Sequence, residues 1–267
     1  MRNGSMKWVA LGLSAVVGLG IAGCDDKPSG NLAPVSSSLA PAKPQSKVSA
    51  KFEVETKSSN VDFLMAAPIE RIHGKAPASI SGDLYLDLSD ITRSNGLIKV
   101  DLDKLALYHA KRETDHAKFG DETKNDRQNE HMRTWMQISD DAPEAMRKSN
   151  RYVEFKLDKV ASASQKNVLA MKGNERKITL TVTGDFRLHG RKVKKTAKLE
   201  ATFKFSGDKP VGVHVETTAP VEVGLKAHDI KPRETIEKLA AKTLGALGQK
   251  VAPNAPVTFD FDAAPAK

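Results

Sequence analysis

The sequence predicts an all-β domain of antiparallel strands, and three observations support that prediction. Apolar residues recur at every second position in one stretch after another, as in Ile178-Leu180-Val182. Turn-forming pairs such as Asn95-Gly96 and His189-Gly190 separate these stretches. No helical segment stands regularly between them, as it would in a parallel sheet. Alternation of this kind places one face of a strand on a core and the other in water.

About ten segments follow the period of two and justify the prediction element by element. In chain order they are residues 52–54, 61–63, 80–88, 98–102, 153–157, 178–188, 197–205, 211–215, 221–225 and 257–261. So many amphipathic strands in one domain must pack as a sandwich or close as a barrel. A soluble barrel of about eight strands can hold one small ligand inside.

Two segments break the alternation and predict one or two short helices that cover sheet ends. Within residues 129–149, Met132, Trp135 and Met136 recur at helical spacing. Residues 233–248 carry an apolar helical face and lie between a proline and a terminal glycine. Residues 108–128 show no apolar period and are interpreted as a long polar loop.

The sequence of the N-terminal residues indicates a targeting segment. Residues 1–23 combine two early cations with an apolar stretch too short to span a bilayer, as signal peptides do. They run into Ile21-Ala22-Gly23-Cys24, which resembles a bacterial lipobox whose cysteine is acylated. The alternative is an ordinary signal peptide with an incidental cysteine. The lipoprotein interpretation predicts an anchored protein of the cell envelope that faces the periplasm, and Asp25 weakly favours the inner membrane.

The predicted domain boundaries follow from composition. Residues 1–23 are the signal peptide, residues 24–46 a lipid-anchored linker, and residues 47–267 the β domain. The linker is rich in Pro and Ser, a composition typical of flexible chain.

The residues give little support to an enzyme. The chain has one cysteine, no Gly-x-Ser-x-Gly and no His-Glu-x-x-His, and no Gly-rich loop opens a helix. His109, His116 and His131, with Glu113 and Asp115, match no familiar metal spacing, so a solvated loop is favoured over a metal site. No catalytic residue, metal or cofactor is predicted.

A basic run is the most marked charge feature in a chain of formal net charge +9. It consists of Arg187, Arg191, Lys192, Lys194, Lys195 and Lys198, with no acid between them. One interpretation is a solvated hairpin, and the other is contact with anionic lipid headgroups at a membrane surface. Nucleic acid is not an expected partner, because no aromatic residues interleave with the cations.

Several segments together resemble the YceI family of lipid- or polyisoprenoid-binding-like domains. Val182 to Gly190 is similar to the family's Thr-Gly-Asp-Leu-Thr-Leu-x-Gly hairpin, and Asn129 to Thr134 to its Arg-Asp-x-His-Leu-Arg-Ser segment. Ser59 to Phe63 and Ile80 to Leu84 resemble its opening strands, and Val257 to Phe261 its closing strand. The resemblance implies an extended, lipocalin-like antiparallel β-barrel with an apolar internal pocket. Gln128 and Asn129 stand where the family has Arg-Asp.

The predicted function is binding or carriage of an isoprenoid or other long-chain lipid by a membrane-anchored protein. The predicted ligand-binding residues are Phe155, Leu180, Val182, Phe186, Leu199, Phe203, His131, Met132 and Trp135. Aromatic residues make up only 5% of the chain, so the interior is not expected to fill itself. The alternative is a stress-related or protein-interaction lipoprotein whose barrel is a filled scaffold. Formation of a homodimer is left open.

Overall fold

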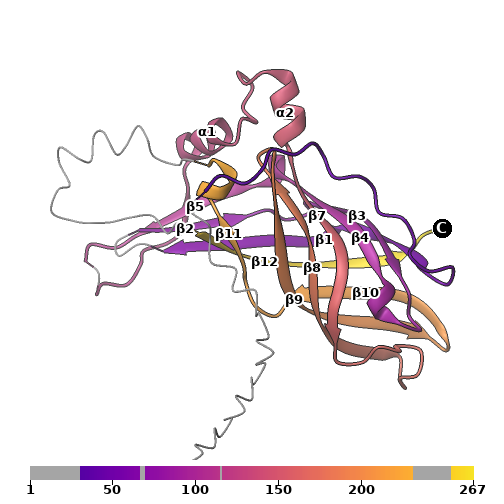
Figure 1. The fold of residues 1–267 in the computed structure, drawn as a ribbon. Helices are drawn as coiled ribbons and strands as arrows, with labels where there is room; N and C mark the ends of the chain where they lie inside the picture. The colour runs from indigo at the N-terminus through magenta and orange to yellow at the C-terminus, as the bar shows by residue number, and fades with distance from the viewer. Residues whose placement is uncertain (1–30, 67–69, 115, 231–253) are drawn as a thin grey trace, which may run out of the picture.

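The computed structural model describes residues 31–66, 70–114, 116–230 and 254–267 (Figure 1). Within these ranges the α-helices are α1 (Asp126–Trp135) and α2 (Glu144–Asn150), and the 3-10 helices are η1 (Ile91–Arg93), η2 (Leu102–Lys104) and η3 (Lys226–His228). The strands are β1 (Ala50–Ala66), β2 (Glu70–Lys75), β3 (Ile80–Leu86), β4 (Asn95–Asp101), β5 (Ala106–Lys111), β6 (Thr123–Lys124), β7 (Tyr152–Ala163), β8 (Glu175–Leu188), β9 (Arg191–Ser206), β10 (Lys209–Thr217), β11 (Val221–Gly224) and β12 (Asn254–Pro265).

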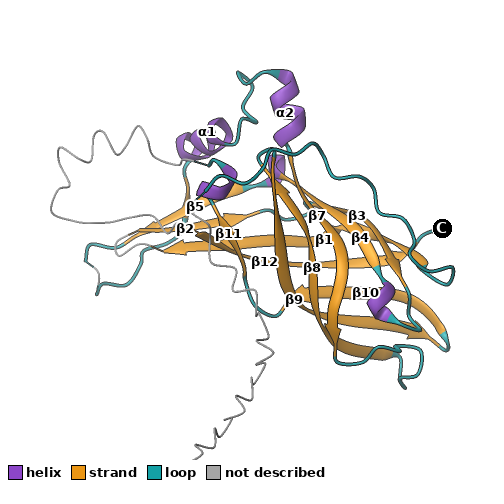
Figure 2. Ribbon diagram, viewed as in Figure 1, coloured by secondary structure: helices purple, strands orange, loops and turns teal. Residues whose placement is uncertain are grey.

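One antiparallel sheet closes on itself to form a barrel (Figure 2). Its order is β11-β12-β10-β9-β8-β7-β4-β3-β1-β2-β5-β6, and a further pairing of β1 with β12 closes the ring. Eight strands make up that ring: β1, β3, β4, β7, β8, β9, β10 and β12. The predicted fold class, an antiparallel β-barrel of about eight strands or slightly more with one or two short covering helices, is confirmed.

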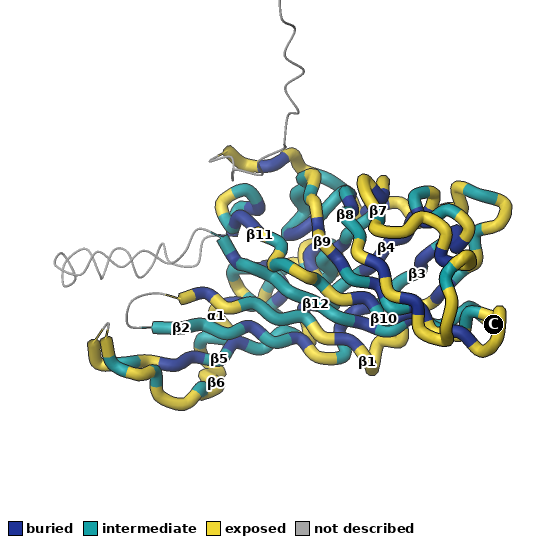
Figure 3. The backbone as a smooth tube through the Cα atoms, turned by 90° about the horizontal axis from the view of Figure 1, so that it is seen from below, coloured by how far each residue is buried: buried dark blue, intermediate teal, exposed yellow. Residues whose placement is uncertain are grey.

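Alternation of side chains explains the closed wall. On β9, residues Ala197, Leu199, Ala201, Phe203 and Phe205 are all buried, while Lys198 and Lys204 between them are exposed. Figure 3 shows the same alternation of buried and exposed residues along β9 and β10. Because each strand has one apolar face, rolling the sheet into a barrel places these faces on a common interior.

The long β1 changes partner along its length and so extends the barrel at one end. Residues 50–53 pair with β3, whereas residues 62–66 pair with β2, which in turn pairs with β5. On the other side of β1, β12 also changes partner, from β10 to β11. Strands β2, β5, β6 and β11 therefore continue the wall beyond the eight-stranded ring.

Two positions in the predicted hairpin motif show why it needs glycine. His189 and Gly190 form the two-residue turn between β8 and β9, with φ of 50° and 69°, as a type I′ turn requires. At Gly184, an added Cβ would lie 2.2 Å from the Lys156 carbonyl oxygen and 2.8 Å from the Phe155 ring. Only glycine allows β7 and β8 to approach this closely.

The structure corrects the expectation that residues 31–46 are flexible linker. This segment, the N-terminal strap, crosses the outside of the barrel from η3 toward β4 (Figure 1). Val35 forms a bridge with Arg191, and Leu39 and Ala42 are buried with Leu97. The barrel holds the strap through backbone hydrogen bonds and through apolar contacts with Leu97.

A buried ion pair fixes the strap to the barrel. Arg187 and Glu154 each have side chains only 1% exposed, and their charged atoms lie 3.6 Å apart. Arg187 Nε donates to the Ser36 carbonyl at 3.0 Å, and Glu154 Oε2 accepts the Leu39 N–H at 2.8 Å. Arg187 also donates to Ser149 on α2. The pair thus joins β7, β8, α2 and the strap.

The helical and loop expectations need correction at several points. The single segment 129–149 is two helices, α1 and α2, separated by residues 136–143. The expected polar loop 108–128 contains most of β5, all of β6 and the start of α1. The predicted helix 233–248 lies outside the described residues. None of the helices in the described ranges has the length and apolarity needed to cross a membrane.

Replacing Arg187 should both destabilise the barrel and release the strap. Arg187→Met removes the guanidinium partner of the buried Glu154 carboxylate but leaves Lys99, whose Nζ lies 3.3 Å from Glu154 Oε1, so it should cost about 3 kcal/mol of unfolding free energy. The matched change Arg127→Met, at an exposed position on α1, should cost under about 0.5 kcal/mol. Urea unfolding measures the first effect, and limited proteolysis within residues 31–46 measures the second. Equal midpoints in the two variants, or unchanged protection of the strap, would contradict this role.

Candidate functional site

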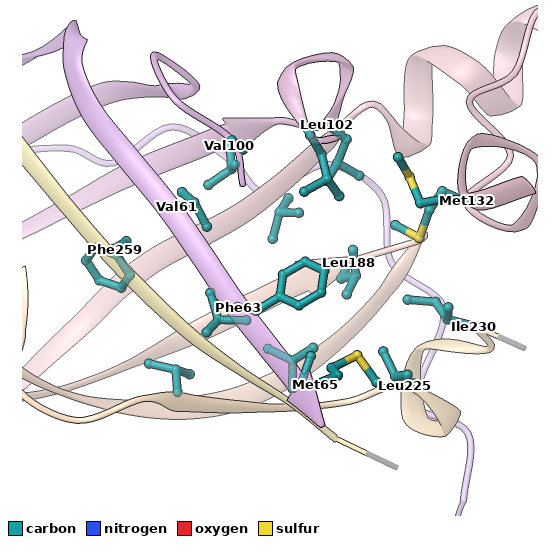
Figure 4. A pocket seen from close by; sticks show the side chains of 18 of the residues that line it. Val61, Phe63, Met65, Val100, Leu102, Met132, Leu188, Leu225, Ile230 and Phe259 are labelled. Atoms are coloured by element: carbon teal, nitrogen blue, oxygen red, sulfur yellow. The ribbon is translucent and has the colours of Figure 1, made fainter. Parts of the chain in front are cut away.

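An apolar cavity of about 270 Å³ occupies the extended end of the barrel. Among the residues that the structure describes, thirty line it, and of these only His109, Gln128, His131 and Lys195 have polar side chains other than the indole of Trp135. Figure 4 shows Val61, Phe63 and Met65 of β1 pointing into it, with Met132 of α1 and Ile230 at its far end. Such a site suits a hydrocarbon chain, because nearly all of its wall offers dispersion contact and no hydrogen bonds.

The strand alternation explains which side chains form the wall. Val61, Phe63 and Met65 occupy the inward positions of β1, and the intervening Leu64 is 43% exposed. Val257 and Phe259 repeat this pattern on β12. The cavity lies at the end of the barrel where these two strands have exchanged the ring partners β3 and β10 for β2 and β11.

Helix α1 covers the cavity with one face. Gln128, His131, Met132 and Trp135 all line it, and their spacing of three and four places them on one side of a helix. Asn129 fixes the helix to β5 by accepting from the Leu107 N–H at 2.7 Å and donating to the Leu107 carbonyl at 3.0 Å. Gln128 therefore lines the cavity, and Asn129 holds the helix that covers it.

A second, smaller cavity of about 80 Å³ lies inside the eight-stranded ring. Ile98, Phe155 and Phe259 line both cavities and so form the partition between them. The ring interior beyond this partition is the main core cluster, built around buried residues such as Ile178 and Phe203.

The predicted ligand-binding residues divide between the two cavities. Phe186, His131, Met132 and Trp135 line the large cavity, Leu180, Val182, Leu199 and Phe203 line the small one, and Phe155 lines both. The sequence pattern identified inward positions but gave no signal for their height in the barrel. It also missed the walls contributed by β2, β5 and β11.

The basic run does not form one exposed patch. Arg187 was predicted to face a membrane, but it is buried and paired with Glu154, so that prediction is wrong for this residue. The Arg191 guanidinium lies 3.4 Å from Asp229 Oδ2, and Lys192 Nζ lies 3.1 Å from Asp185 Oδ2. Lys194 forms ion pairs with Asp158 and Asp185. Lys198 is exposed, and Lys195 lines the large cavity.

The histidines take separate places rather than forming a cluster. His109 was expected in a solvated loop, but it is 7% exposed on β5, with Nδ1 3.1 Å from Glu70 Oε1. His131 is an exposed residue of the cavity lining on α1, and its ring centroid lies 6.1 Å from that of Trp135. Within the described ranges, no three His, Cys, Asp or Glu side chains lie close enough to hold a metal ion.

His228 is buried at the same end of the barrel as the large cavity. Its ring packs edge-on against Phe186, and Nδ1 lies 3.1 Å from the Leu188 carbonyl oxygen. Burial lowers the pKa of His228 to about 4, and the nearby Lys195 charge acts in the same direction. The imidazole is therefore neutral in the folded protein at neutral pH.

Comparison with known proteins identifies the fold. No family model and no curated protein sequence matches the chain. A solved polyisoprenoid-binding domain from Saccharophagus degradans, implicated in plant cell wall breakdown, has a TM-score of 0.52 and 13% identity over 80% of this chain and 98% of that chain. A crystal structure of BcnA from Burkholderia cenocepacia has a TM-score of 0.47 and 14% identity over 79% and 99% of the two chains. The first of these matches confirms the fold implied by the resemblance to the YceI family.

Acid should destabilise the protein through His228. Between the folded pKa of about 4 and the unfolded value of about 6.5, only the unfolded chain binds the proton. The free energy of unfolding should therefore fall by up to about 3 kcal/mol as the pH drops through that window. His228→Asn should remove this component, as shown by urea unfolding of both proteins at pH 7 and at pH 4.5. Equal losses in the two proteins would exclude His228 as the cause.

Proposed function

We propose that this protein is a membrane-anchored, extracytoplasmic binding or carrier protein for an isoprenoid or other long-chain lipid. The observation that carries the proposal is the large cavity, about 270 Å³ with an almost wholly apolar wall. The similarity to a polyisoprenoid-binding domain supports the isoprenoid alternative, although at 13% identity it establishes the fold alone.

Burial of hydrocarbon supplies enough free energy for useful affinity. Each methylene removed from water contributes about 0.8 kcal/mol, so ten methylenes contribute about 8 kcal/mol before the costs of association and ordering. A compact polar metabolite gains little from such a wall. The cavity therefore favours a long apolar tail over a small hydrophilic substrate.

The strap supports a link between the predicted anchor and the cavity. Ala33 donates to the Ala227 carbonyl at 2.8 Å, within η3 and beside the cavity-lining Leu225. The segment from Cys24 to the start of the strap is seven residues long, 24–30. Seven fully extended residues reach at most about 25 Å. Acylation of Cys24 would hold the cavity end close to the membrane from which a lipid is taken.

Filling the large cavity should remove bound lipid. Val100 lines only the large cavity and Val182 only the small one. Val100→Trp should lower the amount of co-purifying lipid severalfold, because the indole occupies the tail site. Val182→Trp should instead overpack the ring interior and cost about 1–3 kcal/mol of stability. Organic extraction and mass spectrometry of domain made in bacteria measure occupancy, with the exposed Val211→Trp as the control for size.

The second candidate is a non-carrier lipoprotein with the barrel as scaffold. It predicts that the folded domain is consistently empty and takes up neither quinone nor polyprenol from vesicles. That result, or equal occupancy in the Val100→Trp and Val211→Trp variants, would refute the proposed binding site.

The anchor is testable independently of the ligand. Cys24→Ser should abolish incorporation of radiolabelled fatty acid and leave the protein in the soluble fraction, because the thiol is the acylated group. Folding of the barrel should be unchanged, which circular dichroism of the two proteins checks. Equal labelling of the mutant would exclude the lipoprotein assignment.

A further inference from the structure

Lys195 is an exception in the alternation of β9. Residues 197, 199, 201, 203 and 205 are inward and buried, and Lys195 occupies the next inward position of the same series. Its neighbour Ala197 also lines the large cavity. From Val193 to Phe205 this face of β9 carries apolar side chains except at Lys195, which lines the cavity.

The residue paired with Lys195 carries no charge that could neutralise it. This partner in the β8–β9 register is Gly184, which has no side chain. The Gly184 Cα faces the Lys156 backbone and the Phe155 ring, and no carboxylate stands in the register position that would pair with the lysine. The inward space at its register partner is therefore filled by the Phe155 ring and the Lys156 backbone, not by an acid.

Lys195 also differs from its basic neighbours in its partners. Arg187, Arg191, Lys192 and Lys194 each have a carboxylate within 4 Å. No ion pair joins Lys195 to any acid in the part of the chain that the structure describes, and the side chain is only partly exposed. A partly buried cation without a counter-ion is costly, so such groups are paired or bind a charged ligand.

We propose that Lys195 binds the anionic head of the lipid, a carboxylate or phosphate, while the tail occupies the large cavity. This inference rests on the proposed function and refines it to anionic single-chain amphiphiles. An ammonium donates to an oxyanion by charge-assisted hydrogen bonds, which are stronger than neutral ones. A fatty acid and a polyprenyl phosphate share this chemistry.

The other polar residues of the cavity lining do not provide a second binding point for an anionic head. The remaining polar lining residues, His109, Gln128 and His131, come from β5 and α1, and His109 is held next to the Glu70 carboxylate. A nearby carboxylate repels an anionic head. Lys195 on β9 is therefore the position in the lining where a negative charge is stabilised.

Matched probes test the charge of the head. The folded protein is equilibrated with neutral phosphatidylcholine vesicles that carry palmitate or hexadecanol, and separately geranylgeranyl phosphate or geranylgeraniol. Wild-type protein should take up each anion in preference to its alcohol. Lys195→Met should lower uptake of both anions about tenfold, because the charged hydrogen bond is lost, and change uptake of the alcohols less than twofold. The matched Lys198→Met, exposed on the same strand, should change neither.

Stability provides a second measurement, because an unpaired charge in an apolar wall is retained at a cost. Lys195→Met should leave the urea midpoint of the empty protein unchanged or raise it. A large destabilisation would indicate a structural role and overturn the inference. Equal uptake of anion and alcohol by wild type would also overturn it, since the ammonium would then be solvated at the rim, while the proposed lipid binding would stand. Failure of all four probes to bind would refute the proposed function itself. A preference for palmitate or for the phosphate identifies which source of the anion the protein uses.

Discussion

Pairing of β1 with β12 is the constraint on which the rest of the structure depends. These strands lie near opposite ends of the chain, yet they pair from Phe52↔Pro265 to Phe63↔Val257. This contact closes eight of the twelve strands into a ring and pairs the edges of β1 and β12, which would otherwise be open to aggregation. It also brings the inward faces of distant strands onto one interior, and without it neither cavity would be enclosed.

The same two strands account for the position of the large cavity. Each exchanges its ring neighbour for an outer strand, β2 or β11. Beyond the ring, α1 covers the extended wall through the hydrogen bonds of Asn129 with Leu107. The aromatic partition of Phe155 and Phe259 then separates a filled core from a space that remains available. The packed core and the large cavity thereby lie along different lengths of the same strands.

The charged side chains of the basic run also divide between structural contacts, the outer surface and the cavity. The buried Arg187–Glu154 pair stabilises a structural junction and satisfies backbone groups of the strap, which offsets part of its desolvation. Most neighbouring cations are neutralised on the outer surface by Asp158, Asp185 and Asp229. Lys195 alone among the basic residues of this run lines the cavity within the described chain. Basic residues that are close together in the sequence thus occupy three different environments in the structure.

The sequence by itself determined the strands of the ring, their inward faces and the tight turn at His189-Gly190, because these depend on local alternation and turn chemistry. It predicted that Met132 and Trp135 share a helical face, since that too is a local spacing. It could not assign Leu180 and Phe186, both inward on β8, to different cavities, because height in a barrel is set by strand register and stagger. Nor could it show that Arg187 is buried or that the Pro-rich strap is bound. Those outcomes depend on partners 38 to 151 residues away in the chain, such as Ser149 and Ser36, which only the tertiary structure brings together.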